Sequence, residues 1–195
     1  MKVYVHSAGK CGSVSMTKSL VKAGYDAKHI HTFDEKRNSW EFYYIFTPIR
    51  ELVSRNVSAY FENCYKGGTV TYNDFLEGYG DRHYKGADFF DKRLRKNWGV
   101  NVYDYPFDTE QGWHIYNGFN VRVMVIRLED FRNWPDAFQA MMGKPAPDLM
   151  HINKTKHPEY RRFVKYENIP AAYYNQMWGT KFMKHFYSDL VDEYA

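Results

Sequence analysis

The chain has 195 residues, enough for one domain with a substantial hydrophobic core, and its hydrophobic (44%) and charged (26%) fractions are those of a globular protein. The formal net charge of +4 allows an anionic ligand, but the Lys and Arg residues are dispersed, which argues against nucleic acid as the partner. The sequence has no signal peptide and no apolar run of about 18 residues, so we expect a cytoplasmic protein without a transmembrane segment.

The N-terminal region predicts a strand, a glycine loop and a helix in succession. Lys2–His6 is rich in β-branched and aromatic residues and predicts a strand. A loop follows up to Gly12, and the helix that begins at Ser13 is expected to end before Gly24, a typical residue just beyond a helix C-terminus.

The rest of the chain continues to alternate between strands and helices. We predict strands at 27–33, 41–47 (ended by Pro48) and 120–128, and helices at 52–64, 89–97, from 133–135 to Gly143, and from about 170 onward. Alternation of this kind is typical of a parallel sheet with helices on both faces, so we expect one α/β domain over residues 1–195.

The first loop has the composition of an anion-binding loop. Gly9 and Gly12 let the main chain approach a ligand closely, and the helix N-terminus adds its dipole and unpaired N–H groups. Ser13 and Ser15 add hydroxyl donors, and Lys10 adds a mobile positive charge. The order of residues is not that of the common nucleotide loop, in which Gly-Lys-[Ser/Thr] follows the first Gly after a four-residue gap.

A second phosphate site is predicted after the strand at 41–47. Arg50 stands at the carboxyl end of that strand, where open α/β sheets bind ligands, and Ser58 follows in the next helix, with Arg55 between them. An arginine at a strand end can bind a phosphate through two N–H groups, while a serine hydroxyl completes the contact.

Together these two segments resemble the sulfotransferases that use 3′-phosphoadenosine 5′-phosphosulfate (PAPS). The matching residues are Lys10, Gly12 and Ser13 in the loop, then Arg50 and Ser58. The run RELVSRNVSAYFEN is similar to carbohydrate sulfotransferases, and VMVIRLEDF is similar to the family's late strand ending in a Glu-Asp pair. VYDYPFDTEQGWHIY is similar to a bacterial branch associated with capsular polysaccharide synthesis.

The resemblance implies a three-layer fold with a central parallel sheet and a P-loop-like donor site. The loop, comprising Gly9, Lys10, Cys11, Gly12, Ser13, Val14 and Ser15, would hold the 5′-phosphosulfate, and Arg50 and Ser58 would hold the 3′-phosphate. Val14 replaces the second hydroxyl residue of many members, a contact that Ser15 or main-chain donors could supply. Lys10 would stabilise the charge that develops on the bridging oxygen, a catalytic role.

The acceptor hydroxyl needs a base, and His31 is our candidate. It lies at the expected carboxyl end of the second strand, in the segment where cytosolic members carry a catalytic histidine. His29 is one rival, and the glutamate base of many carbohydrate-modifying members keeps Asp34 and Glu35 as others.

The remaining candidates follow from composition and from the resemblance. Family members fold a late basic segment over the nucleotide, a role that Lys154, Lys156 and Arg161 could take here. The histidines show no metal-ligand spacing, so no metal is predicted, and the cysteines Cys11 and Cys64 are expected to be free thiols.

The acceptor is expected to be a hydroxyl group on a sugar or glycan. The aromatic content of 19% and the tyrosines between residues 103 and 116 are consistent with a carbohydrate platform. Two other functions remain open: a small-molecule or nucleotide kinase with an atypical phosphate loop, and a nucleotide- or glycan-binding module of the same fold without activity.

Overall fold

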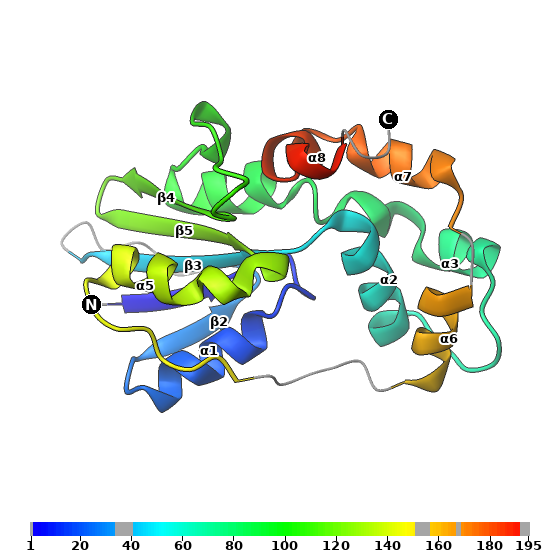
Figure 1. The fold of residues 1–195 in the computed structure, drawn as a ribbon, viewed down its shortest axis with the longest axis horizontal. Helices are drawn as coiled ribbons and strands as arrows, with labels where there is room; N and C mark the ends of the chain where they lie inside the picture. The colour runs from blue at the N-terminus through cyan, green and yellow to red at the C-terminus, as the bar shows by residue number, and fades with distance from the viewer. Residues whose placement is uncertain (1, 34–40, 151–156, 167–168, 192–195) are drawn as a thin grey trace.

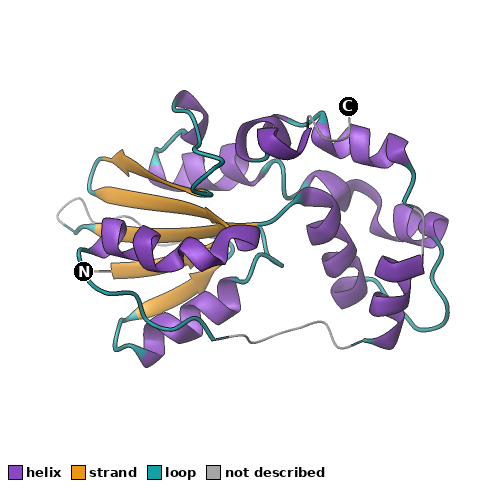
Figure 2. Cartoon of the chain, in the orientation of Figure 1, coloured by secondary structure: helices purple, strands orange, loops and turns teal. Residues whose placement is uncertain are grey.

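The computed structural model of the protein describes residues 2–33, 41–150, 157–166 and 169–191, which form a sheet surrounded by helices (Figures 1 and 2). The strands are β1 (Lys2–His6), β2 (Ala27–Ile30), β3 (Tyr43–Ile49), β4 (Trp113–Gly118) and β5 (Val121–Arg127). The longer helices are α1 (Ser13–Lys22), α2 (Leu52–Asn63), α3 (Tyr72–Tyr79), α5 (Trp134–Met142), α6 (Pro158–Tyr166) and α7 (Ala171–Trp178). The shorter helical segments are η1 (Gly80–Tyr84), η2 (Phe90–Arg95), α4 (Lys96–Trp98), η3 (Val102–Asp104), η4 (Leu128–Asn133), α8 (Lys181–Phe186) and α9 (Ser188–Val191).

The five strands lie in the order β2-β1-β3-β5-β4, and the four on the β2 side are parallel. The prediction of a wholly parallel sheet is wrong at the other edge, where β4 pairs antiparallel with β5. β4 lies outside the predicted strands. It joins β5 through a tight connection in which Asn120 has φ 56°, a left-handed conformation that asparagine tolerates better than most residues.

Two predicted strand ends are also corrected. β3 does not stop before Pro48 but continues to Ile49. Its pairing with β1 ends at Phe46, whereas pairing with β5 runs to Ile49, so Pro48 has a strand on one side only, where a missing N–H is tolerated. β2 ends at Ile30 rather than at residue 33, so His31 follows the strand directly.

Alternation of side chains along the strands builds a core on each face of the sheet. Met124 and Ile126 of β5 face α1 and α5, together with Phe46 of β3. Val123 and Val125 point the other way, into an aromatic cluster with Trp98 of α4 and the residues around η2 and α8. The predicted arrangement of helices on both faces is therefore confirmed.

The predicted helix ends at the sheet are confirmed by their caps. Gly24 (φ 86°) follows α1, where Gly24 N–H donates to the Val21 carbonyl and Tyr25 N–H to that of Leu20, as in a Schellman motif. Gly143 (φ 66°) ends α5 in the same left-handed conformation.

A group of helices lies beyond the carboxyl ends of the strands, on the right of Figure 1. α2 leads into it from β3 and contacts α3, α6 and α7. α3 lies outside the predicted helices, although Thr71 and Asp74 form a capping box at its start. Within the described ranges, no helix is long and apolar enough to cross a membrane.

Candidate functional site

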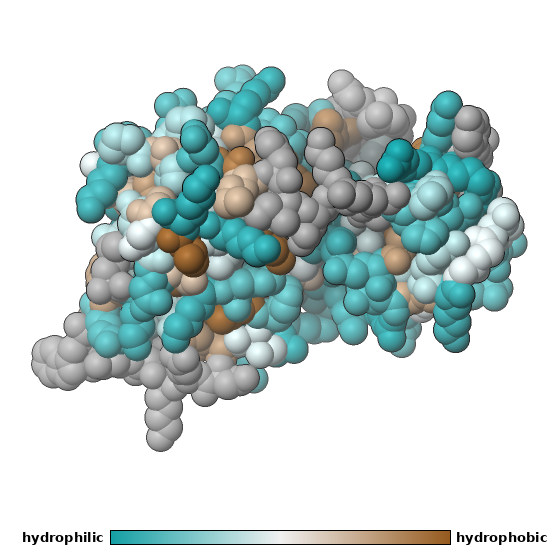
Figure 3. Space-filling view, turned by 90° about the horizontal axis from the view of Figure 1, so that it is seen from below, coloured by the Kyte–Doolittle hydropathy of each residue, from teal (hydrophilic) through white to brown (hydrophobic). Residues whose placement is uncertain are grey.

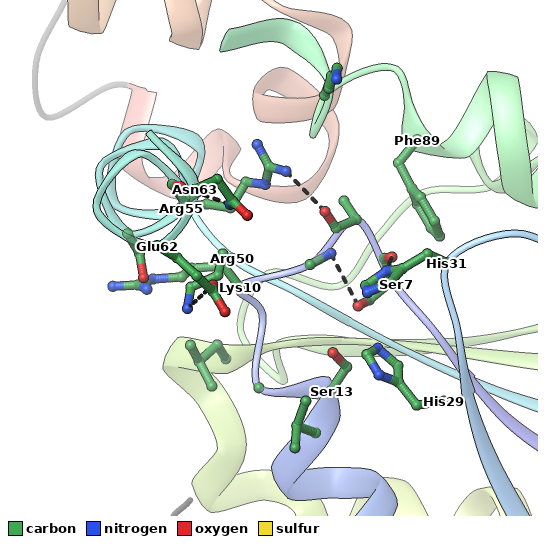
Figure 4. Close-up of a pocket in the computed structure, with 18 of the residues that line it drawn as sticks. Ser7, Lys10, Ser13, His29, His31, Arg50, Arg55, Glu62, Asn63 and Phe89 are labelled. Carbon is green, nitrogen blue, oxygen red and sulfur yellow. Dashed lines mark hydrogen bonds and ion pairs between the residues drawn. The ribbon is translucent and has the colours of Figure 1, made fainter. Parts of the chain in front are cut away.

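A cleft of about 1230 Å³ opens where the carboxyl ends of β1 and β3 meet the helical group (Figure 4). β1 connects to β2 on one side and β3 lies on its other side, so the loops after β1 and β3 leave the sheet in different directions. Open α/β sheets bind ligands at this point. The cleft lining combines the first loop, the start of α1, one face of α2 and residues from η1 to η2.

The first loop has an unusual left-handed main chain. Gly9 (φ 84°), Lys10 (φ 62°) and Gly12 (φ 82°) all adopt conformations that favour glycine. A Cβ atom on Gly12 would also lie 3.0 Å from Leu128 Cδ1 and 3.2 Å from Phe131. Gly12 is therefore required by both conformation and space, and the loop turns sharply into α1.

The N-terminus of α1 faces the cleft. Gly12, Ser13, Val14 and Ser15 all line it, and the N-cap residue, Gly12, has no side chain that could cap the helix. The N–H groups of the first turn are therefore positioned for a ligand that accepts hydrogen bonds. Cys11 differs from its neighbours: its side chain is buried, outside the cleft lining, and donates to the Gly9 carbonyl (3.1 Å), which leaves only its main chain for a ligand.

Burial raises the pKa of the Cys11 thiol to about 11, so the side chain is a neutral packing residue. Cys64 is also a free cysteine, as predicted, and its sulfur accepts a hydrogen bond from Arg82 (2.8 Å).

The predicted second phosphate site lies on the same cleft. Arg50 directly follows β3, and Ser58 lies on α2, and both line the cleft with the first loop. Glu51 begins α2 by accepting hydrogen bonds from the N–H groups of Val53 (2.7 Å) and Ser54 (2.8 Å). This cap satisfies the first N–H groups of α2, whose face with Ser58 lines the cleft.

α2 contributes more polar side chains than the sequence predicted. Arg55, Ser58 and Glu62 recur at three- and four-residue intervals, which places them on one face of the helix, and all three line the cleft together with Asn63. Glu62 forms an ion pair with Lys10 across the cleft. The polar periodicity within the predicted helix was the signal for this face.

Arg55 connects α2 to the first loop. Its guanidinium is buried and donates to the Ala8 carbonyl (2.9 Å), the Tyr79 hydroxyl (3.1 Å) and Asn56 Oδ1 (2.9 Å). Moving any one of these acceptors away would leave a buried polar group without a hydrogen-bond partner, which is unfavourable. The guanidinium therefore keeps the groups around it in place. Arg55 therefore holds the loop against the start of the helical group.

His31 is oriented by the loop. Its Nδ1 lies 3.1 Å from the Ser7 carbonyl, which can only accept, so Nδ1 carries the proton. In the neutral ring this leaves Nε2 with a free lone pair, as a proton acceptor requires. The ring lies against Gly9, where an added Cβ would be 3.6 Å from His31 Cε1.

His29 and His6 surround His31 but differ in environment. Burial, together with the charge of His31, lowers the pKa of His29, whose Nε2 is buried without a hydrogen-bond partner among the described residues. The rings of His29 and His31 lie 4.5 Å apart. Both histidines line the cleft, so His29 stays a rival base by position.

His6 is a structural residue beneath this site. Its Nδ1 accepts from Trp98 Nε1 (3.0 Å), so Nε2 carries the proton and donates to the His31 carbonyl (3.3 Å). Burial lowers the pKa of His6 to about 4, which keeps the ring neutral. The sequence alone did not distinguish His6 from the histidines that line the cleft.

Glu129 follows β5 closely and lies beside the segment of Arg50 and Glu51. It accepts hydrogen bonds from the Glu51 N–H (3.1 Å) and the Tyr187 hydroxyl (3.0 Å). Burial raises the pKa of Glu129, and the nearby positive charge of Arg50 opposes that rise. Glu129 is the first residue of the Glu-Asp pair that follows the strand in the sequence. The other, Asp130, forms an ion pair with Arg127.

Of the three residues predicted for the late basic segment, Arg161 is the one that lies among the described residues. Arg161 lies on the exposed side of α6, outside the cleft lining, and Tyr160 of the same helix lines it instead. Lys154, Lys156, Asp34 and Glu35 lie outside the described residues. Across the described part of the chain, no three His, Cys, Asp or Glu residues are grouped to hold a metal ion.

The lining is strongly cationic, and it suits a ligand with several negative charges. Its cations outnumber its two carboxylates, Glu62 and Asp88; the seven cations are Lys10, Arg50, Arg55, Arg82, Lys85, Lys92 and Arg93. Searches of protein-family models, curated proteins and solved structures find no match for this chain.

Proposed function

We propose that the protein is a PAPS-dependent sulfotransferase that transfers a sulfuryl group to an acceptor hydroxyl on a carbohydrate or glycan. One observation carries the proposal: the loop before α1 and the Arg50–Ser58 pair, predicted separately as two phosphate sites, line the same cleft. A nucleotide with phosphates at both its 5′ and 3′ positions needs two such sites. The resemblance of Lys10, Gly12, Ser13, Arg50 and Ser58 to the donor-binding residues of sulfotransferases supports the same donor.

The two sites differ in the donors they offer. For the 5′-phosphosulfate, Lys10 supplies charge, and Gly12, Ser13 and Ser15 supply main-chain and hydroxyl groups at the N-terminus of α1. For the 3′-phosphate, Arg50 supplies a guanidinium fork and Ser58 a hydroxyl. In this proposal the loop is P-loop-like in position, after β1 and before α1, although its order of residues differs.

The chemistry follows from His31 and Lys10. The acceptor oxygen forms a bond to sulfur while the bond from sulfur to the bridging phosphate oxygen breaks, releasing adenosine 3′,5′-diphosphate. His31 Nε2 takes the proton of the acceptor hydroxyl, because its Nδ1–H is already committed to Ser7. Lys10 stabilises the negative charge that accumulates on the departing phosphate.

Lys10 must exchange one partner for another in this reaction. Its ammonium pairs with Glu62, whose side chain is 56% exposed and so contributes little through this contact to the stability of the fold. A phosphosulfate at the N-terminus of α1 would offer Lys10 a stronger anion within the cleft. Glu62 then acts as a resting partner for the lysine.

The test is a series of thermal unfolding measurements with adenosine 3′,5′-diphosphate, ADP and AMP, each with and without Mg²⁺. A ligand of the native state raises the unfolding temperature according to its concentration relative to its dissociation constant. We expect the largest rise with the 3′,5′-diphosphate, independent of Mg²⁺. A rise with Mg²⁺ and ADP that equals or exceeds it would favour a kinase and overturn the proposal.

Transfer is then measured with sulfur-labelled donor and a panel of oligosaccharides. Label appearing in an oligosaccharide, with one adenosine 3′,5′-diphosphate released per transfer, supports an enzyme. Tight binding of the diphosphate without transfer to any sugar, phenol or lipid hydroxyl would instead indicate a binding module without activity.

A further inference from the structure

A second group of cations lines the cleft from the stretch between η1 and η2. Lys85, Lys92 and Arg93 belong to a helical stretch that continues through η2, together with Phe89. Main-chain bonds from Asp88 to Tyr84 and from Lys92 to Asp88 keep a helical path through this stretch. We call these four residues, Lys85, Phe89, Lys92 and Arg93, the basic stripe.

The opposite side of the same stretch explains why the stripe faces the cleft. Phe90, Leu94 and Trp98 recur at four-residue intervals and are buried in the aromatic core on the sheet. Helical periodicity then turns Lys85, Lys92 and Arg93 outward, where all three are exposed. Their position in the cleft is therefore fixed by core packing.

The charges of the stripe are only partly neutralised. Asp88 pairs with Lys92 (2.6 Å), whereas no ion pair within the described ranges involves Lys85 or Arg93. Exposed like charges that line an open cleft without counter-charges favour the approach of anions. The face seen from below in Figure 3 is mainly hydrophilic, with apolar side chains in small separate patches.

Two cleft residues of this stretch, Phe89 and Arg93, lie near His6. The Lys85 end lies nearer α2, since a Cβ atom on the adjacent Gly86 would contact Leu52 and Arg55. The Phe89 ring packs edge-on against His6 (4.9 Å), and His6 holds the main chain of His31. The positive charge of Arg93 contributes to lowering the pKa of His6, as expected for neighbouring groups. In Figure 4, Phe89 and His31 lie together, on the opposite side of the view from Arg50 and Glu62.

The proposed reaction assigns this side of the cleft to the acceptor. The base must contact the acceptor hydroxyl, so whatever binds beside His31 is the acceptor rather than the nucleotide. The donor's phosphates are already matched by Lys10, the α1 N-terminus and Arg50. Lys85 precedes η2 and Arg93 lies within it, so they would contact separate anionic groups of one extended molecule.

We infer that the basic stripe binds the acceptor, and that the acceptor is an anionic carbohydrate carrying carboxylate or sulfate groups beside its hydroxyls. This inference rests on the proposed function, because it uses His31 as the base. Sugar acids and sulfated sugars combine hydroxyls with anionic groups repeated along the chain, the combination that the stripe and His31 together would recognise.

The experiment compares binding of charged and neutral oligosaccharides to the enzyme saturated with adenosine 3′,5′-diphosphate. The probes are a tetrauronate, the same tetrauronate with its carboxyls methyl-esterified, and a sulfated oligosaccharide with its unsulfated parent. We expect at least one charged probe to bind about tenfold or more tightly than its neutral partner, with an affinity that falls as salt rises.

Variants distinguish binding at the basic stripe from general electrostatic attraction of the probe and from binding at the donor site. The double substitution Lys85→Gln/Arg93→Gln should reduce binding of the charged probe by about tenfold or more and leave binding of the diphosphate unchanged. Arg95→Gln is the matched control, because Arg95 lies on the same stretch, exposed and outside the cleft lining. It should change neither affinity.

Three results would overturn the inference: equal binding of charged and neutral probes, an equal effect of Arg95→Gln, or loss of diphosphate affinity in the double variant. The last result would assign the stripe to the nucleotide. Failure of the wild-type protein to bind the diphosphate would be a different outcome, since it removes the proposed function itself.

Discussion

The two walls of the cleft present different chemical groups to a ligand. The sheet wall offers main-chain N–H groups, the hydroxyls of Ser13 and Ser15, and the imidazole of His31, all set by strand ends and by a left-handed loop. The helical wall offers charged side chains from α2 and from the stretch between η1 and η2. Arg55 joins the two walls through the Ala8 carbonyl.

This difference suggests separate roles for the two walls in the proposed function, one in the chemical step and one in ligand binding. Groups on the sheet wall are held by the main chain, which suits atoms that must be positioned against a reacting bond. Groups on the helical wall are mostly long and exposed, which suits recognition of charge on a ligand. Substitutions of Lys10 and His31 should therefore lower the rate of transfer, whereas those of Arg50 and of the charged residues on the helical wall should lower affinity.

The largest effect is expected for His31→Gln. Loss of the proton acceptor should reduce the turnover number by about 10²- to 10⁴-fold while binding of adenosine 3′,5′-diphosphate is retained. Steady-state transfer with labelled donor measures it. His29→Gln is the matched control, and a larger loss in that variant would identify His29 as the base.

Lys10→Asn should follow with a loss of about 10²- to 10³-fold in the turnover number, because the departing phosphate loses its stabilising charge. Asparagine is chosen because it tolerates the left-handed main chain at this position (φ 62°). Glu62→Gln provides the comparison, since it removes the resting partner but keeps the lysine, and should leave turnover within a few-fold of the wild type. An unchanged turnover number in Lys10→Asn would contradict the assigned role.

The fold should lose stability in acid because of His6. Its pKa is about 4 in the folded protein and about 6.5 when unfolded, so between these values the unfolded chain binds the extra proton. The free energy of unfolding should therefore fall by about 3 kcal/mol as pH decreases from 6.5 to 4 on account of this group.

Urea unfolding at several pH values measures this loss, with His6→Asn as the comparison. Asparagine can still accept the hydrogen bond from Trp98 but does not titrate, so the pH dependence should become shallower by this amount. An identical slope in both proteins would show that His6 is not the group responsible.

Arg50→Gln should have the smallest effect, an approximately 10- to 100-fold weaker binding of adenosine 3′,5′-diphosphate, as expected for one charge-assisted hydrogen bond pair. Isothermal titration calorimetry measures the affinity. Arg161→Gln is the control, because Arg161 is exposed outside the cleft lining. Equal losses in the two variants would indicate general electrostatic attraction rather than a phosphate site at Arg50.

Much of this site was predictable because parallel strands end at a common edge. The loop before α1 and Arg50 follow β1 and β3, which are neighbours in the sheet, and Ser58 comes with α2. Local sequence signals also predicted the ends of the helices, such as Gly24 after α1 and Gly143 after α5.

The remainder depends on contacts between distant parts of the chain. Burial of Cys11, the bond from Arg55 to Ala8 and the packing of Phe89 against His6 are products of tertiary packing, for which local patterns carry no information. β4 was missed because its pairing with β5 is antiparallel at a sheet edge, whereas the alternation of strands and helices predicts only parallel neighbours.

If the proposed function holds, the cleft binds the two phosphates of one nucleotide at separate sites, and phosphorus NMR can observe each phosphate individually. Bound adenosine 3′,5′-diphosphate should show two shifted resonances. Lys10→Asn should alter the 5′-phosphate resonance and Arg50→Gln the 3′-phosphate resonance. If both substitutions altered the same resonance, or if only one phosphate shifted on binding, the two-site account would be contradicted.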